Sequence, residues 1–541
     1  MKRPALSATT LTRCEFATAI LLTIVLVAAH LLFFFHAGPL WRDEISSLAL
    51  ATKPTFSEFW TSLKFDPFPA SYFLVLRLWH ALFGESDLAL RGLGLLTGLI
   101  LIGSLWLGSY PVDRSAPIWP LALFAFNPLV LEAGDSLRPY GFGLIWIVLA
   151  FAFMAQLVFG VPGKIVAACV FVAAVLSVQF NFTNALVLFS LITGAVLVLL
   201  RTRAWLEISL VLAAGMAAAL SLLPYLLIMK ATSEWSKILA NENYFVGVIA
   251  VARDAIASSG VVAEWMWLAL VTVLICAGSV AFICNRPAND RRRGQVIFAA
   301  IVFLVAAGGT LGFLCAAKYL VFPRYFLAIL AIGGLCVDIF WNAIAQQTAI
   351  RVIGLCLGLI VAVTSLHPLF ERAQTRMTNC DQIAAMLEQR AAPDDFIIVT
   401  SPLYGISFQR YYHGRASWMT LPPIDDLTLH RWDLIKKTLA EPDPAPELLA
   451  RAQNALQAGH KIFLVGKLGP APATEPESLP PAPQTRIGWK MEAYTNQWKS
   501  ELTYWFEHHA LHGTNLPVDQ EQSVNPLEQL GLFEISGLRE L

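Results

Sequence analysis

Long apolar runs dominate the first two thirds of the chain, whereas polar residues are concentrated after His367. Runs of about the length needed to cross a hydrocarbon core of ~30 Å recur eleven times. They lie near residues 16–37, 88–109, 116–132, 141–160, 164–180, 184–200, 205–229, 262–284, 295–316, 324–343 and 351–367. The pattern predicts a multi-span α-helical membrane protein, with a transmembrane domain over residues 1–367 and a first outer loop over 38–87.

The remaining segment, residues 368–541, has a different pattern. Two short buried-strand signals at 395–400 and 461–466 alternate with helical patterns near 371–390, 432–439 and 446–458. Strands that alternate with helices predict a small soluble α/β domain. The final part of the chain fits either an added antiparallel layer or a contact at the membrane surface.

Basic residues indicate how the chain is oriented. With a cytoplasmic N-terminus, the inner loops receive most of the basic residues between the spans, as the positive-inside rule requires. These residues are Arg114, Lys164, Arg201, Arg203, Arg286, Arg291, Arg292, Arg293 and Arg351. An odd number of spans then places the α/β domain on the outer face of what we interpret as a bacterial inner membrane. Asp43, Arg138, Lys318 and Arg324 fall on the same face, where we expect them to line one cavity.

Composition supports this interpretation and excludes others. With 57% hydrophobic and only 14% charged residues, the chain is an integral membrane protein by composition. Its formal net charge of zero argues against nucleic acid as a partner. The cysteines and histidines have no disulfide or metal-ligand spacing, so we expect no protein-bound metal and no cofactor. The first apolar run is long for a signal peptide and lacks a small-residue cleavage site, which indicates a retained anchor.

The first outer loop begins with an acidic pair, Asp43 and Glu44, directly after the first span. Ionised groups near hydrocarbon must find water, a cation or a substrate. Two interpretations of Asp43 are open. It is the N-cap of a helix over 45–51, with Glu44 an ordinary first-turn acid, or it is a general base, held partly desolvated so that its pKa suits removal of a proton from a hydroxyl.

Two short helices are predicted after the acidic pair. Thr55 and Glu58 have the spacing of a capping box, and an apolar stripe follows them, which predicts a helix in the membrane interface. Pro69 can open a second apolar helix that runs to about Phe83, before a stop at Gly84. This second helix is too short to cross the membrane and is expected to be half-embedded.

Three cations, Arg138, Lys318 and Arg324, are predicted on the face that carries the acidic pair. Each can be explained singly as an interfacial residue whose charged head reaches water, with Tyr140 and Tyr325 as aromatic neighbours. Together they offer a phosphate clamp, because arginine gives bidentate geometry and lysine a point charge. The set therefore favours an anionic lipid headgroup as a ligand.

The order of these features resembles the GT-C membrane glycosyltransferases. It consists of the first span, Asp43-Glu44, the helix opened by DPFPASYFL at 66–74, LRPY at 137–140 and FPRYFL at 322–327. The chain is most similar to the branch that includes the protein O-mannosyltransferases, the lipid A aminoarabinose transferase and the rhizobial lipopolysaccharide-core galacturonosyltransferases. The resemblance covers about residues 16–367, and an outer α/β tail is also usual in that branch.

The resemblance implies inverting transfer of a sugar from a polyprenyl-phosphate donor to a hydroxyl of a glycolipid, polysaccharide or protein acceptor. The lipid-linked donor, that acceptor and membrane lipid are the implied partners. Asp43 maps onto the acid that removes the acceptor proton, and Glu44 is the second acid of the motif. The implied donor-phosphate ligands are Arg138, Lys318 and Arg324, and the implied cavity residues are Asp66, Tyr72, Tyr140 and Tyr325.

One departure from the resemblance concerns the donor. Relatives often have His-Pro-Pro where this chain has Phe68-Pro69-Ala70. If that histidine contacts the sugar or a metal in relatives, the contact is absent here, which leaves the donor sugar open.

Two other classes of function are open. A transporter or flippase of lipid-linked sugars would use charged groups within broken helices at mid-membrane. A non-catalytic membrane scaffold would only present the outer domain. The acidic pair and the three cations described above are predicted at one face of the membrane, which favours transfer over transport.

Overall fold

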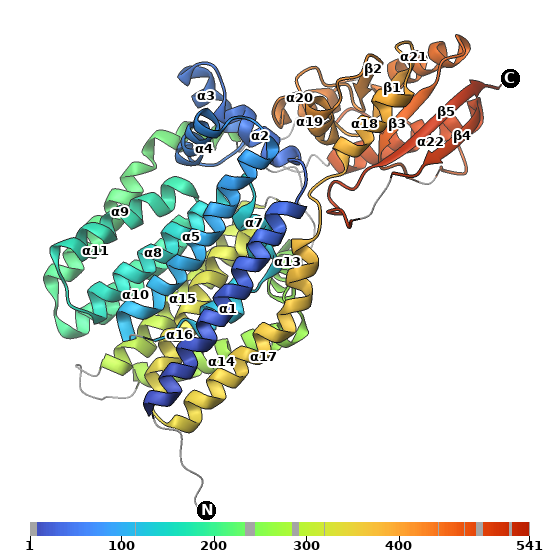
Figure 1. Cartoon of the computed structure of the whole chain (residues 1–541). Helices are drawn as coiled ribbons and strands as arrows, with labels where there is room; N and C mark the ends of the chain where they lie inside the picture. Colours follow the sequence, from blue (N-terminus) through green and yellow to red (C-terminus); the bar gives the residue numbers. More distant parts are fainter. Residues whose placement is uncertain are drawn as a thin grey trace, which may run out of the picture.

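The computed structural model describes residues 8–113, 115–232, 244–283, 291–318, 320–441, 443–469, 471–482, 491–518 and 522–539. Arg114 and Arg286, two of the basic residues used to orient the chain, lie outside these ranges. A helical bundle forms most of the molecule, and an α/β domain sits at one end of it, opposite the N-terminus (Figure 1).

The bundle consists of long apolar helices. They are α1 (Ala8–His36), α5 (Asp87–Asp113), α8 (Tyr140–Phe159), α9 (Lys164–Phe180), α10 (Asn184–Thr202), α11 (Trp205–Ser221), α14 (Val261–Ile283), α15 (Arg291–Ala317), α16 (Leu327–Ile344) and α17 (Thr348–Ala373). In the described part of the chain, nine helical segments are long and apolar enough to cross a membrane. Large apolar side chains such as Leu21, Ile165 and Leu206 are exposed on them, as suits helices surrounded by lipid tails. The predicted class, a multi-span helical membrane protein with a C-terminal α/β domain, is confirmed.

Two of the eleven predicted spans are not among these nine segments of the described chain. α9 has 17 residues and is short for a span. The segment near 116–132 is broken into α6 (Ile118–Pro120), a π-helical turn η2 (Leu121–Ala125) and α7 (Pro128–Asp135). Proline removes a helical hydrogen bond and clashes with the preceding turn. Pro120, at the end of α6, and Pro128, at the start of α7, therefore account for the break. Every residue of η2 is buried, so protein encloses the irregular backbone, as is required at membrane depth.

The first outer loop folds into short helices at the end of the bundle that carries the α/β domain (Figure 1). They are α2 (Arg42–Ala51), α3 (Phe56–Ser62), η1 (Leu63–Phe65) and α4 (Ala70–Phe83). Thr55 caps α3, because its Oγ1 accepts a hydrogen bond of 3.1 Å from the Glu58 N–H. Gly84 ends α4 with a φ of +86°, which glycine adopts readily. Both predicted short helices are therefore present.

Other connections add η3 (Leu223–Tyr225), α12 (Leu226–Thr232), α13 (Tyr244–Ala257) and η4 (Pro323–Phe326). The 3-10 turn η4 leads directly into α16 and is in contact with α13 and α7.

The α/β domain is built on one five-stranded sheet of order β2-β1-β3-β5-β4. Its elements are α18 (Cys380–Arg390), β1 (Phe396–Val399), α19 (Pro402–Tyr411), β2 (Ser417–Thr420), α20 (Trp432–Leu439), α21 (Ala445–Gln457), β3 (Ile462–Gly466), α22 (Met491–His509), β4 (Ala510–Leu516) and β5 (Gly531–Leu538). β1 pairs in parallel with β2 and β3, and β5 pairs antiparallel with β3 and β4. The end of the chain is thus an antiparallel layer, one of the two possibilities left open by the sequence.

Specific polar contacts hold the α/β domain against the outer loop. Asp87, at the start of α5, accepts hydrogen bonds from Arg410 Nη2 at 2.7 Å and from the Tyr411 hydroxyl at 2.8 Å. The Tyr411 hydroxyl also lies 3.1 Å from the carbonyl oxygen of Leu40. α19, which carries both residues, packs on α2. The domain therefore covers the helix that bears the acidic pair.

Candidate active site

Helix α2 carries both acids of the pair and begins one residue before them. Its N-cap is Trp41, so Asp43 lies in the first turn and the N-cap interpretation of Asp43 is wrong. The Glu44 carboxylate accepts the Trp41 backbone N–H at 3.2 Å instead. Acids in a first turn are favoured by the helix dipole.

Glu44 is fully buried and its carboxylate is paired on several sides. Its Oε1 lies 2.6 Å from Arg91 Nη1 of α5 and accepts the Leu137 N–H at 3.0 Å. Arg91 in turn donates to the carbonyl oxygen of Pro39 at 2.8 Å. These contacts join α2, α5 and the segment before α8, which indicates that Glu44 positions α2.

Arg138 forms a second buried ion pair, with Asp66. Two guanidinium nitrogens lie 2.6 and 2.9 Å from the two carboxylate oxygens, a bidentate arrangement. Arg138 Nη1 also donates to Ser47 Oγ at 2.8 Å and to the Asp43 carbonyl oxygen at 3.0 Å. Its guanidinium lies over the ring of Phe68, 5.1 Å from the centroid. Arg138 is thus committed to a protein carboxylate and to the backbone of α2.

Arg324, in η4, faces the carboxylate of Asp43 across a longer gap. Its Nη2 lies 3.6 Å from Asp43 Oδ2, which is an ion pair but beyond a good hydrogen bond. The guanidinium lies over the rings of Phe322 and Tyr140, at 4.5 and 5.8 Å. Its buried Nε has no hydrogen-bond partner among the described residues. Arg324 therefore retains donors that an anionic ligand could use.

His430 of the α/β domain completes the surroundings of Asp43. Its Nε2 lies 3.2 Å from Asp43 Oδ1, and its ring stacks on Trp432 at 5.5 Å with an interplanar angle of 16°. Arg42 Nε lies 3.8 Å from the same carboxylate oxygen. His430 was not predicted as a site residue, because nothing local connects a histidine in a polar tail with an acid 387 positions earlier. The only signal was a histidine two residues before the tryptophan that begins a predicted helix.

The electrostatics at Asp43 differ from those expected of a poised base. Burial by itself raises the pKa of Asp43, but the hydrogen bond with His430 and the nearby positive charges, of which Arg138 is the largest contributor, outweigh it. The net effect holds the pKa of Asp43 below its ordinary value. In this state the carboxylate is ionised and is a weak base.

The remaining predicted residues surround this cluster to different degrees. Tyr140 packs edge-on against Phe68 at 5.3 Å and lies under Arg324. Tyr72 is buried, and no partner for its hydroxyl is found in the described part of the chain. Tyr325 neighbours Arg324 in η4 and packs on Phe322 at 5.9 Å. Lys318 directly follows α15, is exposed and has a left-handed backbone (φ +52°).

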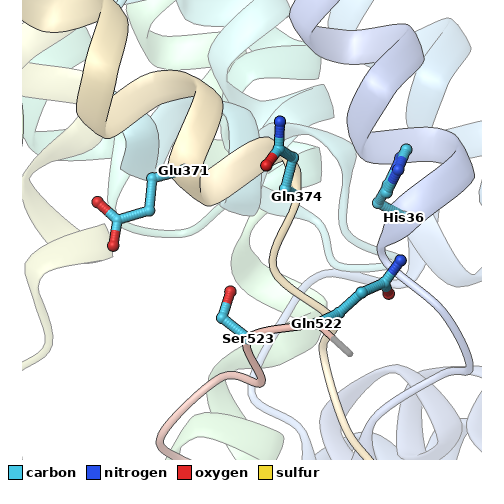
Figure 2. A pocket seen from close by; sticks show the side chains of 5 residues that line it. All are labelled: His36, Glu371, Gln374, Gln522 and Ser523. Atoms are coloured by element: carbon cyan, nitrogen blue, oxygen red, sulfur yellow. The ribbon is translucent and has the colours of Figure 1, made fainter. Parts of the chain in front are cut away.

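Within the described ranges, no group of three or more histidine, cysteine, aspartate or glutamate side chains has the arrangement of a metal site. A polar cavity of about 260 Å³ lies at the junction of the bundle and the α/β domain. Figure 2 shows its lining, which comes from the ends of α1 and α17 and from the segment before β5. The lining residues are His36, Glu371, Gln374, Gln522 and Ser523. None of them belongs to the cluster around Asp43.

Comparison with known proteins gives no assigned family. No protein-family model matches the chain, and no curated protein matches it. Two crystal structures of ArnT from Cupriavidus metallidurans align over most of its length. The structure bound to undecaprenyl phosphate has 11% identity and a TM-score of 0.46, covering 85% of this chain and 93% of that one. The apo structure has 12% identity and a TM-score of 0.48, covering 83% and 93%.

Proposed function

We propose that this protein is an inverting membrane glycosyltransferase of the GT-C kind. It moves a sugar from a polyprenyl-phosphate donor to a hydroxyl of a glycolipid, polysaccharide or protein acceptor at the outer face of the membrane. The observation that carries the proposal is the Asp43–Arg324 pair, with 3.6 Å between Oδ2 and Nη2, at the end of the bundle that the α/β domain covers. A partly buried carboxylate beside an arginine with unused donors supplies both charges that such a transfer needs.

Arg324 is the group best suited to the donor phosphate. The phosphodiester of the donor carries one negative charge, and the leaving phosphate gains a second when its bond to C1 of the sugar breaks. A guanidinium stabilises that charge through paired hydrogen bonds, and this kind of electrostatic stabilisation is usually the largest catalytic contribution. The long gap to Asp43 and the unsatisfied Nε leave Arg324 able to take a phosphate. Arg138, which is paired with Asp66, stabilises the structure around the site.

The surroundings of Arg324 also suit a lipid-linked donor. Leu320 before η4, and Phe245 and Val246 on α13, which contacts η4, are exposed apolar side chains. A polyprenyl chain in the bilayer can lie along such residues while its phosphate reaches the guanidinium. The headgroup and the tail of the donor then each meet a surface of matching polarity.

Asp43 supplies the negative charge on the acceptor side of the reaction. In an inverting transfer the acceptor oxygen attacks C1 on the face opposite the phosphate, and its proton must leave. A phosphate bound at Arg324 would cancel one of the charges that lower the pKa of Asp43. Binding of the donor would therefore raise that pKa, while the carboxylate stays beside the acceptor as a fixed negative charge that can stabilise the departing proton.

Sugar transfer in membranes tests the proposal. Wild type, Asp43→Asn and Arg324→Ala would be produced at equal levels in a strain that lacks the native protein, with exposed Asp425→Asn and Arg415→Ala as matched controls. Mass spectrometry of glycolipids, polysaccharides and proteins reads the added sugar. We expect one defined addition in wild type and both controls, and its loss in both site variants.

The opposite result would overturn the proposal. If both site variants retain full transfer, the cluster has no catalytic role. If no sugar is added by wild type, but labelled polyprenyl-phosphate sugar crosses proteoliposomes that contain it, the protein is a transporter of lipid-linked sugars.

A further inference from the structure

Among the described residues of the α/β domain, only His430 has a side chain in contact with the carboxylate of Asp43. Its side chain is only 8% exposed. Its Nε2 is hydrogen-bonded to Asp43, whereas its Nδ1 is buried and has no hydrogen-bond partner in the described part of the structure. A buried polar atom without a partner is unfavourable, so Nδ1 indicates a missing ligand atom.

The state of the neighbouring acid determines the tautomer of His430. Because the cations around Asp43 keep its carboxylate ionised, that carboxylate can only accept hydrogen bonds. The hydrogen of a neutral imidazole must then lie on Nε2 and be donated to Asp43 Oδ1. Nδ1 consequently carries a lone pair and is a proton acceptor. An acid that orients an imidazole in this manner is a common arrangement for general bases.

The chain around His430 is anchored so that the imidazole is held in place. The next residue, Arg431, pairs with Asp426 and with Asp433, where the Nη2–Oδ2 distance is 2.8 Å. The Arg431 guanidinium also lies over the ring of Phe65 in η1, 5.1 Å from the centroid. Stacking on Trp432 fixes the plane of the ring. The α/β domain thus presents His430 to the outer loop at a defined position.

We propose that His430 is the general base of the transfer reaction and that Asp43 orients it. This inference rests on the proposed function. The acceptor hydroxyl gives its proton to Nδ1 while its oxygen forms the new bond to C1 of the sugar. The bond between C1 and the phosphate oxygen breaks, and its electron pair stays on the phosphate, which leaves as a dianion held by Arg324. The imidazolium is paired with Asp43 and later loses its proton to water.

This assignment explains why the carboxylate of Asp43 is surrounded by positive charge. A strongly stabilised carboxylate is a weak base but a good partner for an imidazolium. The charged groups that face His430 are Asp43 itself and, around that carboxylate, Arg42, Arg138 and Arg324. Because Nδ1 is buried here, the acceptor reaches it only after a rearrangement that keeps the contact between His430 and Asp43, a gating step of a kind that many enzymes use.

The test compares His430→Gln with His413→Gln, an exposed histidine of the same domain. Glutamine can keep a hydrogen bond to Asp43 but cannot take up a proton. The full-length protein in membranes would be assayed for sugar addition between pH 5 and 9, and the purified protein for binding of polyprenyl phosphate by thermal shift. We expect His430→Gln to slow transfer by ~10²–10⁴-fold while binding of polyprenyl phosphate is unchanged. We expect His413→Gln to behave as wild type.

Two further readouts separate a base from a merely structural residue. The wild-type rate should fall toward acidic pH, because a general base is inactive once it is protonated, and the residual rate of His430→Gln should lack that fall. The double variant Asp43→Asn/His430→Gln should lose no more than the more severe single variant, because the two residues act as a unit.

The outcomes also separate this inference from the proposed function. If wild type neither transfers sugar nor binds polyprenyl phosphate, the proposed function fails. If wild type transfers sugar and Asp43→Asn does not, but His430→Gln transfers at the wild-type rate, only the role of His430 is wrong. A wild-type rate that rises toward acidic pH would also contradict the inference, because His430 would then act as a proton or hydrogen-bond donor.

Discussion

Glu44 of α2 and Arg91 of α5 form a buried ion pair with 2.6 Å between Oε1 and Nη1. The pair joins the acidic motif to the bundle, and both side chains are almost inaccessible to solvent. Removing one partner of such a pair leaves an uncompensated buried charge, which costs ~3–5 kcal/mol.

Glu44→Gln should therefore act on stability. We expect a lower thermal midpoint in detergent and reduced yield, with transfer by the folded fraction largely retained. Asp43→Asn should show the reverse, a nearly unchanged midpoint and lost transfer. Circular dichroism and transfer assays on the same preparations measure both. An unchanged midpoint with abolished transfer in Glu44→Gln would restore the catalytic role that the sequence suggested.

Arg138→Lys tests whether this arginine holds the protein or the donor. Lysine keeps the charge but loses the bidentate contact with Asp66, at 2.6 and 2.9 Å in the structure. We expect a lower thermal midpoint and little change in affinity for polyprenyl phosphate. Arg324→Lys should instead weaken that affinity by about tenfold or more, since a charged hydrogen bond contributes ~1.5–3 kcal/mol. Equal losses of affinity in the two variants would place both arginines on the phosphate.

Gly98 of α5 is expected to tolerate no side chain. A Cβ there would come within 2.1 Å of Asp135 Oδ1 and 2.4 Å of His30 Nδ1, two residues joined by a buried hydrogen bond of 2.7 Å. Gly98→Ala should lower the thermal midpoint, because overpacking costs ~1–3 kcal/mol. Gly103→Ala on the same helix meets open space and is the matched control. Equal midpoints for the two variants would contradict this packing.

Glu528 is expected to make the stability of the contact between the two domains depend on pH. It is fully buried, accepts the Arg42 N–H at 3.2 Å and pairs with Ser407. Burial, opposed by Arg42 and Ser407, raises the pKa of Glu528 from 4.5 to about 7. Between pH 4.5 and about 7 the folded protein binds more protons at Glu528 than the unfolded protein does. The contribution of Glu528 to stability is therefore complete below about pH 4.5 and is lost as pH rises through about 7.

Unfolding of the α/β domain, followed by tryptophan fluorescence at pH 5 and pH 8, measures this effect. We expect lower stability at pH 8 by up to ~3 kcal/mol, from ~1.4 kcal/mol per pKa unit. Glu528→Gln, which is neutral at both pH values, should remove most of the difference. If the difference persists in that variant, another group is responsible.

Much of the architecture could be predicted from local pattern. Apolar runs matched to the thickness of a bilayer gave the spans, and the capping residue Thr55 and the stop at Gly84 gave the helices of the outer loop. α20 and β3 lie where their patterns predicted them. The break near 116–132 was missed because hydropathy averages over the run and is insensitive to two prolines and a π-helical turn.

The site was predicted only in part. Counting spans placed Asp43 and Arg324 on one membrane face, and in the structure 3.6 Å separates Asp43 Oδ2 from Arg324 Nη2. The division of roles between Asp43 and Glu44 did not follow, although successive residues of a helix point about 100° apart. One of the two side chains, Asp43 or Glu44, points into the bundle and the other toward the α/β domain. Which one does which depends on where α5 and α19 lie relative to α2.

The sequence by itself determined the spans, the existence of the α/β domain and the face on which the charged residues gather, because these depend on the length, polarity and order of segments. Only the tertiary structure decided which charge meets which. It paired Arg138 with Asp66, Glu44 with Arg91, and His430 with Asp43. The physical reason is that an ion pair forms over a few ångströms of space whatever the separation in sequence, and 387 positions separate His430 from Asp43.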